Sequence, residues 1–326
     1  MNAFNRRQAL ALGAAALAPS WAAAQAQPKI DRPVRIVVPY PPGGTSDLLA
    51  RTVGVRLGER LGQPVVIENK AGAGGVVGSQ QVAKAVPDGT TLLLSTIASH
   101  GIIPALQKTP PYDPVRDFTP ITVIAGTPNV LLVNKDLPVR TLEEFLALAR
   151  SKPGALSFGS TSQGGSPHMS GELLKVTAKI DMLHVPYKGG GPMLIDLMGG
   201  QVPAAFDNLP SAMAHIRGGK VRALAVTTTK RWPTAPEIPT MAEAGVPGYE
   251  MSAWFGLMGP AGMPMPLAQM LQREVAAILQ EPEVAKRLLE LGAEPSGITS
   301  EEFARFLVNE REKWTRVGAS SGVKLD

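Results

Sequence analysis

Residues 34–61, with the sequence VRIVVPYPPGGTSDLLARTVGVRLGERL, decide the fold. The β-branched run at 34–40 is typical of a buried strand, and the Pro and Gly residues at 41–44 end it. Apolar residues then recur every four positions from Leu49 to Leu61, which is the spacing of one face of an α-helix. The stretch therefore predicts a strand that is followed directly by a helix.

The residues that follow repeat this order of elements. Residues 64–68 predict a second strand, the glycine-rich turn at 72–75 leads into a second helix, and residues 91–95 predict a third strand. Strands that alternate with helices in this way are typical of a parallel sheet with crossover helices.

A second unit of the same kind follows the proline-rich stretch at 110–114. Its strands are predicted at 121–125, 130–133, 156–158, 182–185, 204–206 and 221–226. Helices are predicted between most of them, and the first of these helices opens on the capping box Thr141-Leu142-Glu143-Glu144. From about residue 263 the apolar spacing predicts only helices, at 265–279, 284–291 and 301–317.

These patterns predict an α/β fold of two lobes, each with a mostly parallel open sheet, and a helical C-terminal tail. The tail has no sheet of its own, so we expect it to pack on the first lobe. The first lobe would then comprise residues 28–126 and 230–326, and the second lobe residues 127–229. Because the chain would cross between the lobes twice, we expect a hinge and a ligand cleft there.

Residues 1–27 have the features of an export signal. Arg6 and Arg7 supply a positive start, residues 9–18 are apolar, and small residues at 22–26 suit cleavage. Paired arginines occur in both ordinary and twin-arginine signals, so both export routes stay open. No later segment is apolar for 18 residues, so we expect a soluble mature protein in a bacterial periplasm.

Composition excludes several classes of protein. The chain of 326 residues is 44% hydrophobic and 18% charged, as in an ordinary globular protein, and it has no Cys for disulfides or thiolate chemistry. Its net charge of +5 falls to +3 once Arg6 and Arg7 are removed with the signal, since 30 basic residues then face 27 acidic ones. This excess is too small and too scattered to indicate a nucleic-acid partner.

A first candidate ligand loop lies at 40–47, between the first strand and its helix. Ligands of open α/β sheets bind at this position, where backbone N–H groups and the positive helix end attract an anion. Thr45 or Ser46 is expected to cap the helix, with Asp47 in its first turn. A plain capped turn is the structural alternative.

A second candidate loop, at 159–168, has the same position in the second unit. Its hydroxyl groups and Gly residues precede a helix with Pro167 in its first turn, and His168 follows. Two such loops, one in each lobe, would hold an anion from both sides of the cleft. After a later strand, Asn208 is expected to bind an anion more easily than Asp207 does, and Tyr187 and Trp254 are further candidates to line the cleft.

Other chemistry receives little support. The glycine-rich turn at 72–75 lacks the third Gly and the acidic residue of a dinucleotide site. The four histidines have no metal-ligand spacing, so we expect neither a metal nor another cofactor. Ser160 or Ser162 with His168 would be the components of a serine hydrolase, but no Asp is evidently placed to orient the imidazole.

Five motifs in this order resemble the periplasmic solute receptors of tripartite tricarboxylate transporters, the Bug receptors. The motifs are residues 36–47, 68–75, 159–168, 184–189 and 254–257, and the resemblance covers essentially the whole mature chain. One departure is Ala71, where the family usually has Pro.

The resemblance implies a type II periplasmic-binding-protein fold, the Venus flytrap, which binds small carboxylates without an arginine clamp. It implies delivery to one large and one small integral-membrane transporter subunit, and we expect a monomeric binding protein rather than an enzyme. Together with the loops, the predicted ligand-binding residues are Tyr40, Gly44, Thr45, Ser46, Asp47, Ser160, Thr161, Ser166, His168, Tyr187 and Asn208. A periplasmic ligand sensor and a secreted serine hydrolase stay open as alternatives, and the carboxylate itself is not identified.

Overall fold

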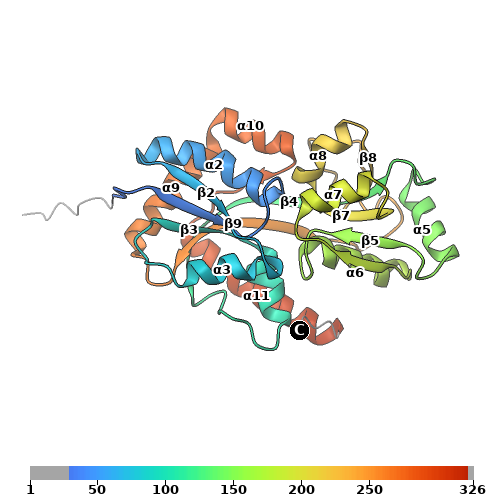
Figure 1. Ribbon diagram of the computed structural model, residues 1–326, viewed down its shortest axis with the longest axis horizontal. Helices are drawn as coiled ribbons and strands as arrows, with labels where there is room; N and C mark the ends of the chain where they lie inside the picture. Colours follow the sequence, from blue (N-terminus) through green and yellow to red (C-terminus); the bar gives the residue numbers. More distant parts are fainter. Residues whose placement is uncertain (1–28, 322–326) are drawn as a thin grey trace, which may run out of the picture.

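The computed structural model describes residues 29–321, which form two lobes side by side (Figure 1). The strands join into one continuous sheet in the order β2-β1-β3-β9-β4-β7-β5-β6, with β8 and β10 paired to β4. The two-lobe α/β fold predicted from the sequence is therefore confirmed. The predicted signal at 1–27 lies outside the described residues.

The first lobe is built around the three strands predicted at its start. β1 (Val34–Val38) pairs in parallel with β2 (Val65–Asn69) and β3 (Thr91–Thr96). The helix α2 (Thr45–Leu61) connects β1 to β2, and the shorter α3 (Val76–Ala83) lies between β2 and β3 in the chain. The apolar residues of both helices face the sheet. A π-helix, η3 (Ala98–Ile102), and a single turn, α4 (Ile103–Leu106), follow β3 and were not predicted.

The second lobe repeats the arrangement. β5 (Ser157–Ser160) pairs in parallel with β6 (Leu183–Pro186) and β7 (Ala204–Asn208). The helices of this lobe are α5 (Leu142–Ser151), α6 (Ser166–Ala178), α7 (Gly190–Met198) and α8 (Leu209–Arg217), and β8 (Val221–Val226) completes its sheet. The predicted cap of α5 is present, since Thr141 Oγ1 accepts the Glu144 N–H at 3.2 Å.

One long strand joins the lobes. The sequence predicted two strands at 121–125 and 130–133, but the structure has a single strand, β4 (Phe118–Asn134). Its first part, up to Pro128, pairs with β9 (Ser252–Pro260), and its last part, from Asn129, pairs with β7 and β8. Gly126 and Pro128, which lie between the two predicted strands, are part of β4 because pairing with β9 holds the backbone extended.

The complete sheets are mixed rather than mostly parallel. β9 was not predicted, yet it lies between β3 and β4 and is antiparallel to both. A short β10 (Glu294–Pro295) also pairs antiparallel with β4, as do β7 and β8. In each lobe, the parallel strands therefore form one half of the sheet, and the antiparallel strands that link the lobes form the other half.

The helical tail packs on the first lobe, as predicted. It consists of α9 (Met265–Gln280), α10 (Pro282–Leu291) and α11 (Ser300–Ser321). α9 packs against β4 and α2, and α11 packs against β4 and α4. Buried Glu310 on α11 accepts the indole N–H groups of Trp254 and Trp314, so it ties the tail to β9.

Residues 227–251 connect β8 to β9, and the first part of this connection packs on the second lobe. Trp232, Ala235 and Ile238 belong to the apolar cluster of α7, α8 and β8. Thr240 bridges Val226, the last residue of β8. Trp232, Ala235 and Ile238, which the predicted division at 229/230 gives to the first lobe, thus contact the second lobe. Met241 and Val246 belong to the other apolar cluster, and Thr234 Oγ1 donates to Leu289 O on α10 of the tail.

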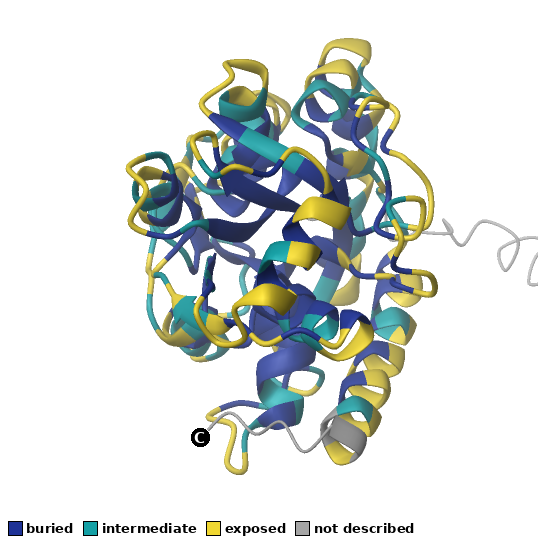
Figure 2. Cartoon of the chain, turned by 90° about the vertical axis from the view of Figure 1, so that its right-hand side faces the viewer, coloured by how far each residue is buried: buried dark blue, intermediate teal, exposed yellow. Residues whose placement is uncertain are grey.

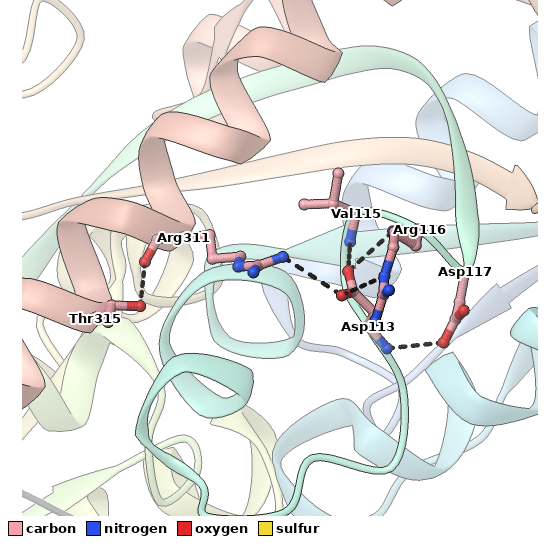
Figure 3. A network of polar contacts seen from close by, with 6 residues as sticks. All are labelled: Asp113, Val115, Arg116, Asp117, Arg311 and Thr315. Carbon is pink, nitrogen blue, oxygen red and sulfur yellow. Dashed lines mark hydrogen bonds and ion pairs between the residues drawn. The ribbon is translucent and has the colours of Figure 1, made fainter.

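The remaining long connection, between α4 and β4, is held by a carboxylate. Asp113 accepts the backbone N–H groups of Val115 and Arg116 and pairs with the guanidinium groups of Arg116 and Arg311 (Figure 3). Arg311 lies on α11, so this network fixes the proline-rich stretch to the tail.

Burial follows the layers: the strands are dark blue in the interior and many turns at the rim are yellow (Figure 2). Among residues 29–321, no helix has the length and apolar character required to cross a bilayer.

The close approach of α6 to its sheet generates a prediction. A Cβ atom at Gly171 would lie 2.1 Å from the ring of Phe158, which is fully buried on β5. We expect Gly171→Ala to lower the free energy of unfolding by about 1–3 kcal/mol, because the ring has no space to move into. Urea denaturation followed by circular dichroism measures this.

Gly126→Ala is the matched control, since the nearest atom to its new methyl group is 3.9 Å away. Equal unfolding midpoints for the two variants would contradict this account of the packing.

Candidate ligand-binding site

A cavity lies between the lobes, where the carboxyl ends of the parallel strands meet. It holds about 490 Å³ of space free of protein atoms, including the part open to solvent. Its walls come from the segments that follow β1, β3, β5, β6 and β7, together with β9. Both lobes therefore contribute to one site, at the position that open α/β sheets use for ligands.

Seven of the predicted ligand-binding residues line this cavity. They are Tyr40, Gly44, Thr45, Ser46, Thr161, Ser166 and Asn208. The two loops proposed from the sequence thus lie opposite each other across one space. Their contact with a ligand stays a prediction.

Four helices begin at the cavity. The N-cap residues of α2, α6, α7 and α8 are Gly44, Gly165, Gly189 and Asn208, and all four line it. None of these caps makes a side-chain hydrogen bond to its helix. Because each helix end carries about half an elementary positive charge, the four ends together favour an anion.

The expected cap of α2 was wrong. We expected Thr45 or Ser46 to cap the helix, but Gly44 is the N-cap and Thr45 is already the first helical residue. Gly44 takes the extended backbone that a cap requires, with φ −83° and ψ 171°. The two hydroxyl groups are consequently not used for capping and lie in the cavity wall.

The cavity lining within residues 29–321 contains no Lys, Arg or His. Its titratable side chains are those of Tyr40 and Asp207. Burial raises the pKa of Tyr40 to about 12, so the phenol is neutral; it donates to Gly74 O at 2.8 Å and lies 2.9 Å from Thr96 Oγ1. The positive potential of the site therefore comes from backbone dipoles rather than from cationic side chains.

The lobes touch beside the cavity. Thr45 Oγ1 on α2 donates to Ser211 Oγ on α8 at 3.3 Å. A Cβ at Gly189 would lie 3.0 Å from the ring of Pro41, and this glycine has a φ of 143°. A side chain at Gly189 would therefore hold the two lobes apart.

Asn129 organises the second-lobe wall. It lies on β4 where the strand passes from one lobe to the other, and it is fully buried. Its Oδ1 accepts from Ser166 Oγ at 3.3 Å and from Asn208 Nδ2 at 2.6 Å, and its Nδ2 donates to Ser170 at 2.9 Å. One side chain thus fixes the starts of α6 and α8 relative to the crossing point.

Asp47, a predicted binding residue, does not line the cavity. Its carboxylate accepts the Gly43 N–H at 3.0 Å, the Asn69 amide at 3.1 Å and the Arg51 guanidinium at 3.0 Å. Burial by itself would raise the pKa of Asp47, but these hydrogen bonds outweigh it and hold the pKa below its ordinary value. Asp47 therefore braces the first loop from behind.

Ser160 and His168 also lie behind the wall. Ser160 is fully buried and its hydroxyl lies 2.7 Å from His184 Nε2. His168 stacks on His184 with 3.8 Å between ring centroids, and its Nδ1 accepts the Gly164 N–H at 3.0 Å. Burial lowers the pKa of both histidines, that of His184 to about 3, so the neutral pair supports the second loop. The hydrolase alternative paired Ser160 or Ser162 with His168, whereas Ser160 meets His184 outside the cavity lining.

The side chains of Tyr187 and Trp254 do not line this cavity. Tyr187 lines an adjoining, larger cavity and donates to Asp196 at 2.9 Å. Trp254 packs edge-on against Phe303 and Phe306 on α11. Because alternate residues of a strand face opposite sides, the neighbours Ala253 and Phe255 line the cavity in its place.

Comparison with known proteins identifies the family. Residues 49–323 match the family described as "Tripartite tricarboxylate transporter family receptor". The chain belongs to this family. It is a Bug-type solute-binding receptor, as the motifs predicted.

Individual relatives agree with this assignment. Protein BugT of Bordetella pertussis is 36% identical over 295 residues, which are 90% of each chain. The structure "R. palustris Rpa4515 with adipate" is 41% identical with a TM-score of 0.87, covering 90% of this chain and 98% of that one. MatC from Rhodopseudomonas palustris with bound malate is 36% identical with a TM-score of 0.83, covering 88% and 99%. The predicted periplasmic-binding-protein fold is thereby confirmed.

Part of the cavity wall of the receptor was not predicted from its sequence. The unpredicted residues are Thr96, Ile97, Ala98, Gly189, Gly190, Ala253 and Phe255. Pro41, Ser162, Gly165 and Pro167 lie within the two predicted loops, and Asp207 was expected to bind an anion less easily than Asn208. The rule that placed the first loop also applies to β3, which runs parallel to β1, so the segment 96–98 was predictable. β9 carried no such signal, because the strand itself was not predicted.

In the part of the receptor that is described, no group of three or more His, Asp or Glu side chains is placed to hold a metal ion.

The brace behind the first loop generates a prediction. We expect Asp47→Ala to lower the free energy of unfolding at pH 7 by about 1–3 kcal/mol, because it removes the shared acceptor of Gly43, Asn69 and Arg51. A depressed pKa means that this stability is present above the ordinary pKa of Asp and is lost as the pH falls through the folded-state pKa. The difference between variant and wild type should therefore shrink below about pH 4.

Denaturant titrations at several pH values measure this difference, with exposed Asp136→Ala as the control. A difference that stays constant down to pH 2 would show that the carboxylate charge has no part in the brace.

Proposed function

We propose that this receptor captures a small carboxylate between its lobes in the periplasm and delivers it to the membrane subunits of a tripartite tricarboxylate-type transporter. Dicarboxylates, tricarboxylates, aromatic acids and acidic amino acids are the candidate classes. The proposal treats the chain as a binding protein rather than an enzyme.

The observation that carries the proposal is the convergence of four helix N-termini on a cavity without cationic side chains. Such an arrangement favours anions, and the hydroxyl groups of Thr45, Ser46, Thr161 and Ser166 add donors that suit carboxylate oxygens. Because α2 belongs to one lobe and α6–α8 to the other, the set of donors is complete only when the lobes are closed.

The relatives support the carboxylate class. The structures of Rpa4515 and MatC are described with adipate and with malate, which are both dicarboxylates. The description of the family as a transporter receptor supports delivery to membrane subunits. A periplasmic ligand sensor would use the same cavity, and genes for the two membrane subunits beside the gene of this receptor would favour transport.

The first test is a thermal-shift screen of the mature protein against a panel of carboxylates, after unfolding and refolding to remove bound ligand. A ligand at 100 times its dissociation constant should add about 2.7 kcal/mol of stability, because it binds only the folded state. We expect a large rise in Tm with one class of acid and none with the corresponding amides. No rise with any acid would contradict the carboxylate proposal.

A second prediction concerns the hydroxyl that joins the lobes. Thr45→Ala should weaken carboxylate binding by about 1–3 kcal/mol, since Thr45 lines the cavity and also bonds Ser211 across it. Thr52→Ala on the same helix is the control, because that hydroxyl bonds only to Leu48 O of its own helix. Isothermal titration calorimetry measures both, and equal affinities of the two variants would remove Thr45 from the site.

A further inference from the structure

One carboxyl group in the cavity wall has no evident purpose in an anion site. Asp207 is the penultimate residue of β7 and is 1% exposed. Its Oδ1 accepts the N–H of Asn208 at 2.8 Å, whereas its buried Oδ2 has no hydrogen-bond partner. A buried polar atom without a partner is costly, so this oxygen calls for a partner that the protein does not supply.

The elements packed around Asp207 provide no compensating charge. They contribute Val130 on β4, Gly190 on α7 and Ser211 on α8, and none of these is charged. A Cβ atom at Gly190 would lie 3.3 Å from both carboxyl oxygens of Asp207. Because Gly190 has no side chain, it leaves room for this carboxyl group at the start of α7. Ser211 donates to Asn208 O and accepts from Thr45, so its hydroxyl is occupied.

The other titratable groups near the cavity do not balance Asp207 either. Tyr40 is neutral, and Asp47 lies behind the first loop with Arg51 as its partner. His168 and His184 lie behind the second loop and stack on each other. An ionised Asp207 would therefore place a second negative charge beside a bound carboxylate, and like charges at such short range repel each other strongly.

We propose that Asp207 binds the ligand as a neutral carboxylic acid, whose Oδ2–H donates a hydrogen bond to a carboxylate oxygen of the ligand. This inference rests on the proposed function, and it adds that each carboxylate is taken up together with one proton whenever Asp207 is ionised in the free receptor. The proton comes from solvent and stays on Oδ2, so the ligand carboxylate beside Asp207 meets a neutral acid instead of a second negative charge. Asp207 thereby becomes a specificity residue that selects acceptor oxygens at this position.

The protonation behaviour of the free receptor agrees with this role. Burial raises the pKa of Asp207 to about 7, although the nearby Ser211 hydroxyl and the Asn208 N–H, which favour the charged form, lower it in part. Asp207 thus changes its protonation state near neutral pH, and an adjacent carboxylate would shift the balance further toward the acid.

The test is the pH dependence of affinity, with adipate and malate as probes, measured by isothermal titration calorimetry from pH 6.5 to 9. Both acids are fully ionised over this range, so any change in affinity comes from the protein. We expect the dissociation constant to be nearly constant at the acid end and to rise about tenfold per pH unit above the pKa of Asp207. Titrations at pH 8.5 in buffers of different ionisation enthalpy should report uptake of about one proton per ligand.

Asp207→Asn separates this account from a general effect of pH. The amide has the same shape and can donate an N–H to the ligand, but it does not titrate. We expect this variant to bind with an affinity that is independent of pH and to take up no proton. Asp136→Asn, at an exposed position beside Lys135, should behave as wild type does.

The outcomes distinguish this inference from the function on which it rests. If neither probe nor any other carboxylate binds at any pH, the proposed function fails. If a carboxylate binds with an affinity that is constant, or that increases with pH, the neutral-acid role of Asp207 is wrong while the carboxylate receptor stands. If Asp207→Asn does not fold, the pH profile and proton uptake of the wild-type receptor decide the question alone.

Discussion

The architecture depends on one strand that belongs to both lobes. β4 pairs with β9 over its first part and with β7 and β8 over its last residues, so the two sheets are joined at Pro128 and Asn129. This connection turns the carboxyl ends of the two parallel halves toward each other. The loops that open α2, α6, α7 and α8 then surround one cavity. Asn129, at the crossing point, holds Ser166 and Asn208 in place, so the strand that joins the lobes also shapes the site.

The chemistry of the site follows from the same geometry. Helix N-termini supply partial positive charge that is fixed in direction and needs no mobile side chain. Under the proposed function, a cavity lined in this way would suit carboxylates of different lengths, because the donors belong to the backbone and to short hydroxyl side chains. A guanidinium would bind one carboxylate more tightly and in a fixed bidentate geometry. Selectivity among acids then depends on the few titratable side chains in the cavity wall, which are those of Tyr40 and Asp207. Of these two, Asp207 has a buried oxygen without a hydrogen-bond partner.

Local sequence patterns were sufficient to predict most of the fold and about half of the residues that line the cavity. The strand–helix units, the two ligand loops and the packing of the tail were all predictable, because apolar periodicity and glycine-rich turns are local signals. β9 was not, since residues 252–260 contain two Gly and lie between two antiparallel partners that only the tertiary fold provides. The position of Asp47 behind its loop was missed for a similar reason. A carboxylate next to a helix N-terminus suggests binding, and only the contacts with Arg51 and Asn69 show that it serves as a brace.

The most direct test of the central claim is a crystal structure of the receptor with a bound dicarboxylate such as adipate. The account predicts that one carboxylate lies between the lobes and accepts backbone N–H groups from the start of α2 and from at least one helix of the second lobe. It predicts no contact with Lys or Arg for that group. A dicarboxylate held instead by cationic side chains, such as Lys188 in the adjoining cavity, would contradict the claim that converging helix ends make the site.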